Sequence, residues 1–194
     1  MEKYNLGLIN RPPQTLENLQ VTIDLAKTED AEVYRKIRLE AIDQDPEAFD
    51  MQNEKKRERQ KSRDISEWKK DIQEQVVLLA KNDSEVIGLV KGVDRGQGLW
   101  SINNVYLTPA FRKNVNGAPI GDEMIKKVLD EIKNRGGQKA RLWVKNSNKG
   151  ATKFYEVLGF KKIETRKAMS IVGKRIDLLI GWSILEKDLN AETK

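Results

Sequence analysis

The stretch that decides the fold is VYLTPAFRKNVNGAPIGDE at residues 105–123, together with the helical pattern that follows it. It predicts a strand, a break at Pro109, a loop that contains Gly117 and Gly121, and then a helix. Such a turn presents free backbone N–H groups at the positive end of the helix dipole, which suits a phosphate or pyrophosphate. An ordinary strand–loop–helix connection would carry the same glycines, so the stretch alone leaves both interpretations open.

The helix after this loop has apolar residues at the spacing of one buried face, and Gly136–Gly137 ends it. Those apolar residues are Met124, Ile125, Val128, Leu129 and Ile132. Upstream, the segments 76–80 and 86–93 predict an antiparallel hairpin, and 99–107 predicts the strand that enters the loop.

Two helices are expected before that hairpin. The first begins at Thr28 as N-cap and runs to about Ile42, with Val33, Ile37 and Ala41 facing inward. This first helix follows a strand that is expected at 21–25. The second begins at Ser66 as a possible N-cap and runs to Glu74, with Trp68 and Ile72 on one side.

Downstream, alternation predicts a strand at 140–144, and Ser147 or Asn148 can cap a short helix that ends near Gly159. Strand segments are expected near 160–163, 169–172 and 176–185. The sequence thus predicts one domain at 21–189 after an extension at 1–20. Its class is α/β (α+β mixed), with a mixed, mostly antiparallel central sheet and helices on both faces.

The composition excludes several kinds of protein. With 194 residues, the chain can build one sizeable core. Its apolar runs are too short to cross a membrane, and its first residues lack the order of a secretion signal, so a cytoplasmic protein is expected. The chain has no cysteine and no histidine, so thiol nucleophiles, imidazole bases, and thiolate and imidazole metal ligands are absent. This favours group transfer in which a cofactor brings the activated group.

The net charge of +6 fits either an anionic ligand or nucleic acid. Basic and acidic residues alternate closely, however, as in EKKRERQKSRD at 54–64. Such mixed-sign runs are typical of solvated faces, so no nucleic-acid partner is expected.

Three stretches resemble the GNAT superfamily of N-acetyltransferases, which use acetyl-coenzyme A. Residues 21–49 are similar to the opening strand and helix, with an RLEA…PEAF pattern common in one bacterial branch. Residues 105–124 are similar to the acetyl-CoA motif. Residues 142–160 are the most specific match, because five residues fall at the spacing of the family signature. They are Asn148, Ala151, Tyr155, Gly159 and Phe160.

The resemblance implies a GNAT-type fold, acetyl-CoA as co-substrate and no metal. It also implies a set of cofactor-binding residues: Val105 and Leu107 for the pantetheine arm, Arg112, Gly117, Ala118, Ile120 and Gly121 for the pyrophosphate, and Asn148 for the coenzyme arm. Tyr155 matches the family tyrosine that protonates, or stabilises, the departing thiolate. A tyrosine near its ordinary pKa of about 10 can donate that proton at neutral pH.

The chain departs from the family pattern in its phosphate loop. Residues 113–116 separate Arg112 from Gly117, and Pro119, which has no N–H, stands where a second glycine is usual. The strand at 99–107 also lacks the carboxylate that many members use as a base. Glu47, Asp50 and Glu54 are alternatives, as is water relayed by Ser101 or Asn103.

The expected function is transfer of the acetyl group to a primary amine of an unidentified small molecule or protein, by direct attack in a ternary complex. The alternative is a non-catalytic domain of this fold that binds an acyl-CoA or a protein partner. Near the C-terminus, Ile180, Trp182 and Ile184 form either a homodimer surface or a strand buried in the same chain.

Overall fold

The computed structural model describes residues 20–51, 53–112, 119–172 and 175–191, and for 166–180 only the backbone. Most of the predicted extension at 1–20 therefore lies outside the described residues. The elements are β1 (Val21–Leu25), α1 (Ala31–Gln44), α2 (Glu54–Lys61), α3 (Ile65–Glu74), β2 (Val76–Asn82), β3 (Glu85–Asp94), β4 (Leu99–Leu107), α4 (Ile120–Asn134), β5 (Lys139–Lys145), α5 (Lys149–Val157), β6 (Lys161–Val172) and β7 (Arg175–Asp188).

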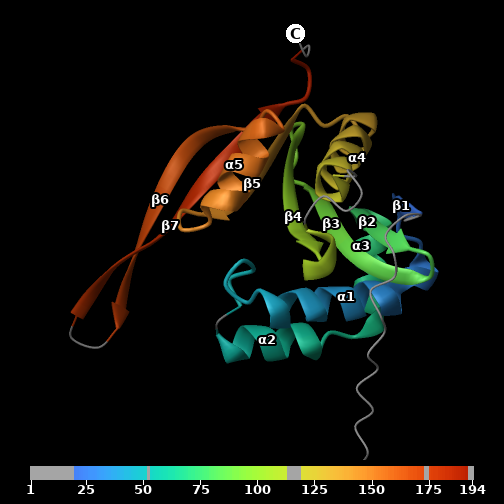
Figure 1. Cartoon of the computed structure of the whole chain (residues 1–194), viewed down its shortest axis with the longest axis horizontal. Coiled ribbons are helices and arrows are strands. Elements are labelled where there is room, and N and C mark those ends of the chain that lie inside the picture. The colour runs from blue at the N-terminus through green and yellow to red at the C-terminus, as the bar shows by residue number, and fades with distance from the viewer. Residues whose placement is uncertain (1–19, 52, 113–118, 173–174, 192–194) are drawn as a thin grey trace, which may run out of the picture.

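The strands form one sheet in the order β1-β2-β3-β4-β5-β7-β6 (Figure 1). All described neighbours are antiparallel except β4 and β5, which run parallel because α4 connects them. The predicted mixed, mostly antiparallel sheet is confirmed, as are the hairpin of β2 and β3 and the strand β4.

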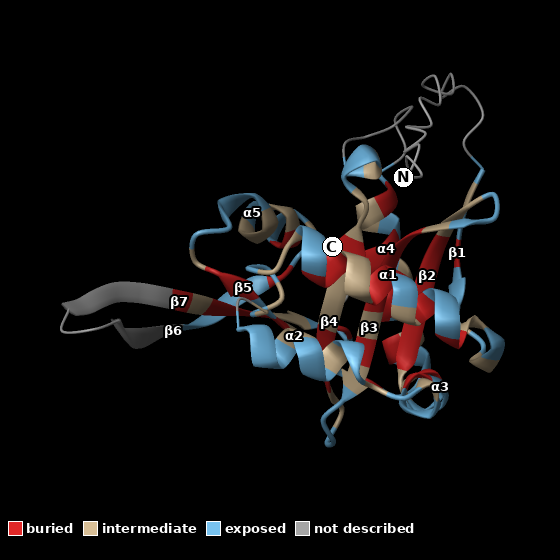
Figure 2. Cartoon of the chain, turned by 90° about the horizontal axis from the view of Figure 1, so that it is seen from below, coloured by how far each residue is buried: buried red, intermediate tan, exposed pale blue. Residues whose placement is uncertain are grey.

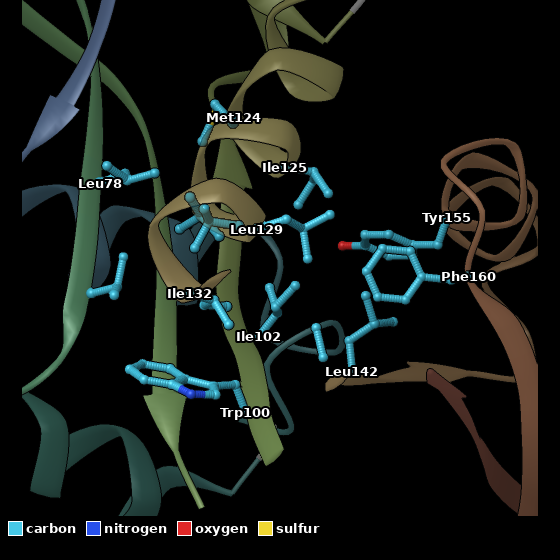
Figure 3. Close-up of a cluster of buried hydrophobic side chains, with 14 of the residues drawn as sticks. Leu78, Trp100, Ile102, Met124, Ile125, Leu129, Ile132, Leu142, Tyr155 and Phe160 are labelled. Carbon is cyan, nitrogen blue, oxygen red and sulfur yellow. The ribbon is translucent and has the colours of Figure 1, made fainter. Parts of the chain in front are cut away.

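Helices cover both faces of the sheet, as predicted, and each face has its own core. On one face α1 and α3 pack on the sheet around Tyr34, Trp68 and Leu89. On the other face α4 and α5 lie over a larger core, to which Ile125 and Tyr155 both belong (Figure 3). The buried residues of α4 are the predicted ones with Ile120 added: Ile120, Met124, Ile125, Val128, Leu129 and Ile132.

The predicted inward face of α1 is partly wrong. Ile37 and Ala41 are buried, but Val33 is 39% exposed and the neighbouring Tyr34 is fully buried in its place. The helix start also differs from the prediction. Residues Thr28–Asp30 form a short 3-10 helix, and the carboxylate of Asp30 accepts a hydrogen bond from the Lys27 N–H at 2.8 Å.

The structure differs from the prediction in one helix cap, in one exposed helix and in the C-terminal strands. The N-cap of α3 is Asp64 rather than Ser66, because its carboxylate accepts from the Ser66 N–H and Glu67 completes a capping box. The mixed-charge segment at 54–61 is the helix α2, which has no buried residue and lies along α1 (Figures 1 and 2). The C-terminal strand segments join into one long hairpin, β6 and β7, which extends beyond the rest of the sheet (Figure 1).

Candidate active site

The sheet opens between β4 and β5. These strands pair only at Leu99↔Lys139, Trp100↔Ala140 and Ser101↔Arg141, although β4 continues to Leu107 and β5 to Lys145. The register of β4 against β3 also shifts by one residue near Asn104, which has a positive φ of 57°. A bulge of this kind bends the strand that carries it. The result is a gap between two parallel strands at their C-terminal ends.

The backbone of β4 presents alternate residues to this gap. The Thr108 N–H donates to the Ile87 carbonyl at 2.8 Å, so Thr108 and Tyr106 face β3. Because the polar groups of successive strand residues point in opposite directions, those of Val105 and Leu107 face the gap. The carbonyl of Leu107 accepts a hydrogen bond from Arg112 Nε at 2.7 Å.

A cavity of about 850 Å³ occupies the gap. Its walls include residues 44–50 at the end of α1 and just after it, residues 102–105 of β4, residues 142–145 of β5, and α5. Arg38 and Lys91 line it from the face that α1 and α3 cover, whereas Ala151 and Tyr155 line it from the face that α4 and α5 cover. The cavity therefore connects the two faces of the sheet.

Tyr155 stands at the α5 side of this cavity. It is 8% exposed, and its ring packs edge-on against Phe154 and Phe160 at centroid distances of 5.0 and 5.7 Å. Its hydroxyl points toward α4 (Figure 3), and it has no hydrogen-bond partner within the described chain. Burial raises the pKa of Tyr155 above its ordinary value, so the hydroxyl keeps its proton.

Asn148 begins α5. Its Oδ1 accepts the Ala151 N–H at 3.0 Å, which makes it the N-cap, one of the two residues predicted for that position. The side chain also lines the cavity, and its amide N–H groups can still donate.

The start of α4 lies near α5, because a Cβ at Gly121 would be 3.5 Å from the Phe154 ring. Pro119 accepts the Glu123 N–H at 3.1 Å, and the N–H groups of Ile120, Gly121 and Asp122 have no partner within the helix. Two of these N–H groups belong to Ile120 and Gly121, which were predicted from the sequence to bind the pyrophosphate. Gly117 and Ala118, like 113–116, lie outside the described residues.

Arg112 already has partners around β4. Besides Leu107, its guanidinium forms an ion pair with Asp45 and lies over the Tyr106 ring, 5.4 Å from the centroid. Its side chain is 41% exposed. A phosphate that binds Arg112 must therefore compete with Asp45.

Only two of the three carboxylates considered as the base lie at the cavity. Glu47 and Asp50 line the cavity, but Glu54 does not. Glu47 lies 3.7 Å from Lys145 Nζ, and Asp50 pairs with Lys56. Asn103 also lines the cavity and donates to Ser101 Oγ at 3.1 Å.

Three basic residues of the cavity were not predicted as part of a site. Lys91 and Lys145 sit within strands, and Arg38 occupies the buried face of α1 one turn after Tyr34. An arginine at an apolar position of a helix is the signal that could have found Arg38.

Two of the residues considered for a homodimer surface lie elsewhere. Trp182 also lines the cavity, and Ile184 is buried in its own chain. For Ile180 the structure describes only the backbone.

None of the described helices has the length and apolar character needed to cross a membrane. The described residues contain no cluster of three or more acidic side chains that could hold a metal ion.

The chain matches known acetyltransferases in sequence. Residues 39–160 match the model of the acetyltransferase (GNAT) family. Over 75 residues the chain is 39% identical to an uncharacterised N-acetyltransferase of Methanocaldococcus jannaschii. This match covers 39% of the chain and 31% of the relative, so the chain spans about a third of that curated protein.

Solved structures share the fold at low sequence identity. A GNAT-family acetyltransferase of Streptococcus pneumoniae superposes with a TM-score of 0.70 at 14% identity, over 87% of this chain and 99% of that one. The protein yncA of Salmonella typhimurium, solved with acetyl-CoA, gives 0.67 at 16% identity over 90% and 96%. The PaiA N-acetyltransferase of Thermoplasma acidophilum, in complex with coenzyme A, gives 0.64 at 20% identity over 88% and 99%.

Proposed function

The chain belongs to the acetyltransferase (GNAT) family, and we propose that it transfers the acetyl group of acetyl-CoA to a primary amine by direct attack in a ternary complex. The observation that carries this proposal is the cavity that connects the two faces of the sheet through the gap between β4 and β5. A donor on one face and an acceptor on the other can meet there without a covalent intermediate.

The residues on the α4 and α5 face fit the donor. The free N–H groups of Ile120 and Gly121 suit the pyrophosphate, together with Gly117, Ala118 and, once it leaves Asp45, Arg112. The outward backbone groups of Val105 and Leu107 suit the amide-containing pantetheine arm, and Asn148 has amide donors for it. When bound, acetyl-CoA supplies an acyl thioester.

Tyr155 is the proposed general acid. Its buried, unpartnered hydroxyl keeps its proton at neutral pH and can donate it to the sulfur as the C–S bond breaks. The N–H of Leu107 is the proposed donor to the carbonyl oxygen on which negative charge develops. The new bond joins the amine nitrogen to the acetyl carbon.

The amine must lose a proton in the same sequence of steps. Glu47 and Asp50 are the carboxylates at the cavity that can accept it directly, and Asn103 can orient a water that does so. An acceptor that arrives neutral requires neither. The composition supports direct attack, because a chain without cysteine has no thiol to carry the acetyl group.

We assign this activity to one domain at residues 21–189. The test is to mix the protein with acetyl-CoA and panels of small amines and peptides, and to follow both free thiol and the mass of the acceptor. Thiol release that requires the amine, with intersecting initial-velocity lines, supports a ternary complex. Parallel lines would indicate an acetyl-enzyme and contradict direct attack, and no acetylation of any amine would count against the proposal.

A further inference from the structure

Arg38 is an unpaired cation in the interior. It is 5% exposed, and it has no hydrogen-bond or ion-pair partner within the described chain. Its Nη1 is enclosed without an acceptor, and its guanidinium lies 4.6 Å from the centroid of the Phe49 ring. The residue lines the cavity from the α1 side. A buried charge without a partner is costly, so its presence calls for a functional explanation.

A second cation lies at the same end of the cavity. Lys91 of β3 lines it, and the side chain is 15% exposed. Its Nζ is 3.4 Å from Asp71 Oδ2, but Arg63 Nη2 lies 3.2 Å from the same oxygen. Tyr34 donates to that oxygen too, at 3.4 Å. The Asp71 carboxylate is thus shared by Lys91 and Arg63, and it makes no ion pair with Arg38.

The other charges around this end do not neutralise Arg38. Glu40 accepts a hydrogen bond from Tyr106 at 3.0 Å. Each of the three acidic residues of the cavity has a basic partner: Asp45 pairs with Arg112, Glu47 with Lys145 and Asp50 with Lys56. The α1 end therefore has an excess of positive charge. Burial lowers the pKa of Arg38 to about 10, so it is still charged at neutral pH.

From this arrangement we infer that Arg38 and Lys91 form an oxyanion subsite that binds a carboxylate or phosphate of the acceptor. The inference rests on the proposed function, and it narrows the acceptor to an amine that also carries an anionic group, such as an amino acid, a peptide end or an aminoalkyl phosphate. The anionic group binds at the α1 end and directs the amine toward the gap between β4 and β5. A planar guanidinium suits this role because it presents paired donors to an oxyanion.

The first test measures anion binding without catalysis. Acetate and inorganic phosphate are titrated separately into protein saturated with coenzyme A, which occupies the donor site, and the backbone amide signals of the cavity residues are followed by NMR in every protein. Wild type is compared with Arg38→Met and with Lys36→Met, which removes an exposed charge two residues earlier on α1. Binding that weakens about tenfold or more in Arg38→Met alone supports the subsite. No binding of either anion, or equal binding in all three proteins, overturns it.

The second test uses acceptors. The twenty amino acids are compared with their decarboxylated amines, and phosphoethanolamine with propylamine, by kcat/KM for acetylation. We expect the anionic member of a pair to be preferred, and Arg38→Met to abolish that preference by raising KM. A preference within the amino-acid pairs indicates that the subsite binds a carboxylate, and a preference for phosphoethanolamine over propylamine indicates that it binds a phosphate. A preference for uncharged amines, or one that Arg38→Met leaves intact, overturns the inference while leaving acetyl transfer standing. If no amine is acetylated, the proposed function fails, and anion binding alone decides on the subsite.

The melting temperature of Arg38→Met distinguishes a role of Arg38 in binding from a role in the stability of the fold. Because methionine removes an unpaired buried charge and keeps most of the side-chain volume, we expect Arg38→Met to melt at the same temperature as wild type or higher. A lower melting temperature together with unchanged acceptor preference would assign Arg38 to the scaffold and contradict the inference.

Discussion

Arg112 donates from Nε to the carbonyl oxygen of Leu107 at 2.7 Å, while its terminal nitrogen pairs with Asp45. One side chain thus links the end of β4 to the end of α1, and both segments border the cavity. It also means that the arginine we assign to the pyrophosphate already has an anionic partner.

Removing that partner should tighten donor binding. In Asp45→Asn, Arg112 no longer has a competing carboxylate, so we expect the dissociation constant of acetyl-CoA to fall about two- to fivefold, in line with an exposed ion pair worth up to about 1 kcal/mol. Calorimetry provides the measurement. In an Arg112→Met background the same change should have no effect. If Asp45→Asn acts equally in both backgrounds, Arg112 does not bind the donor.

Tyr155→Phe should lower kcat far more than it weakens donor binding. The variant keeps the ring that packs on Phe154 and Phe160 but has no proton for the departing sulfur. We expect kcat to fall about a hundredfold, the lower part of the range for general acids, because a thiolate leaves readily. Steady-state thiol release measures it, and unchanged kcat would remove Tyr155 from the mechanism.

The pH dependence of kcat should have no alkaline decline. Burial raises the pKa of Tyr155 above its ordinary value of about 10, so its hydroxyl stays protonated up to that pH. The rate should rise with pH as the amine loses its proton, and then stay level to about pH 10. Tyr155→Phe should give the same profile at a lower level. A decline of the wild type alone below pH 10 would show that Tyr155 ionises earlier than its burial implies.

Among the glycines whose surroundings the structure describes, Gly137 has the tightest, so its replacement should cost most in stability. A Cβ there would lie 2.3 Å from Ile132 Cγ2 and 2.8 Å from both the Ile132 carbonyl oxygen and Trp100 Cδ1. We expect Gly137→Ala to lower the free energy of unfolding by about 1–3 kcal/mol in urea titrations. Gly150→Ala, whose Cβ meets only Asn148 Oδ1 at 3.9 Å, is the control and should match wild type or exceed it. Equal stability of both variants would contradict the packing around Gly137.

Local patterns were sufficient to predict most of the fold. The spacing of apolar residues in 124–132 and the alternation in 99–107 survive in the structure because those segments bury one continuous face. The helix α2 was missed because it has no apolar face to reveal its period. Val33 was chosen over Tyr34 because a single-residue error in helical phase is easy to make when apolar residues are few.

The site was less accessible to prediction from the sequence. The family signature led to Tyr155 and Asn148, which do meet at the cavity. Arg38 and Lys91 could not be assigned to it, because they lie 53 residues apart and only the packing of α1 against β3 brings them to one end of the cavity. That Arg38 has no hydrogen-bond or ion-pair partner within the described chain is a property of the tertiary structure, whereas the local sequence shows only an arginine on the apolar face of a helix.

The central claim is that the donor's pyrophosphate binds at the start of α4, and Gly121→Glu tests it most directly. Glutamate suits the first turn of a helix, and its Cβ would make only ordinary contact with Phe154 at 3.5 Å, so the fold should persist. Gly121→Gln controls for size, and Lys126→Glu controls for charge at an exposed position of α4.

Acetyl-CoA binding by calorimetry is the measurement. We predict micromolar affinity for wild type and both controls, and a loss of more than about tenfold, or about 1.4 kcal/mol, for Gly121→Glu alone. Wild-type affinity in Gly121→Glu would contradict the assignment of the pyrophosphate to this helix start.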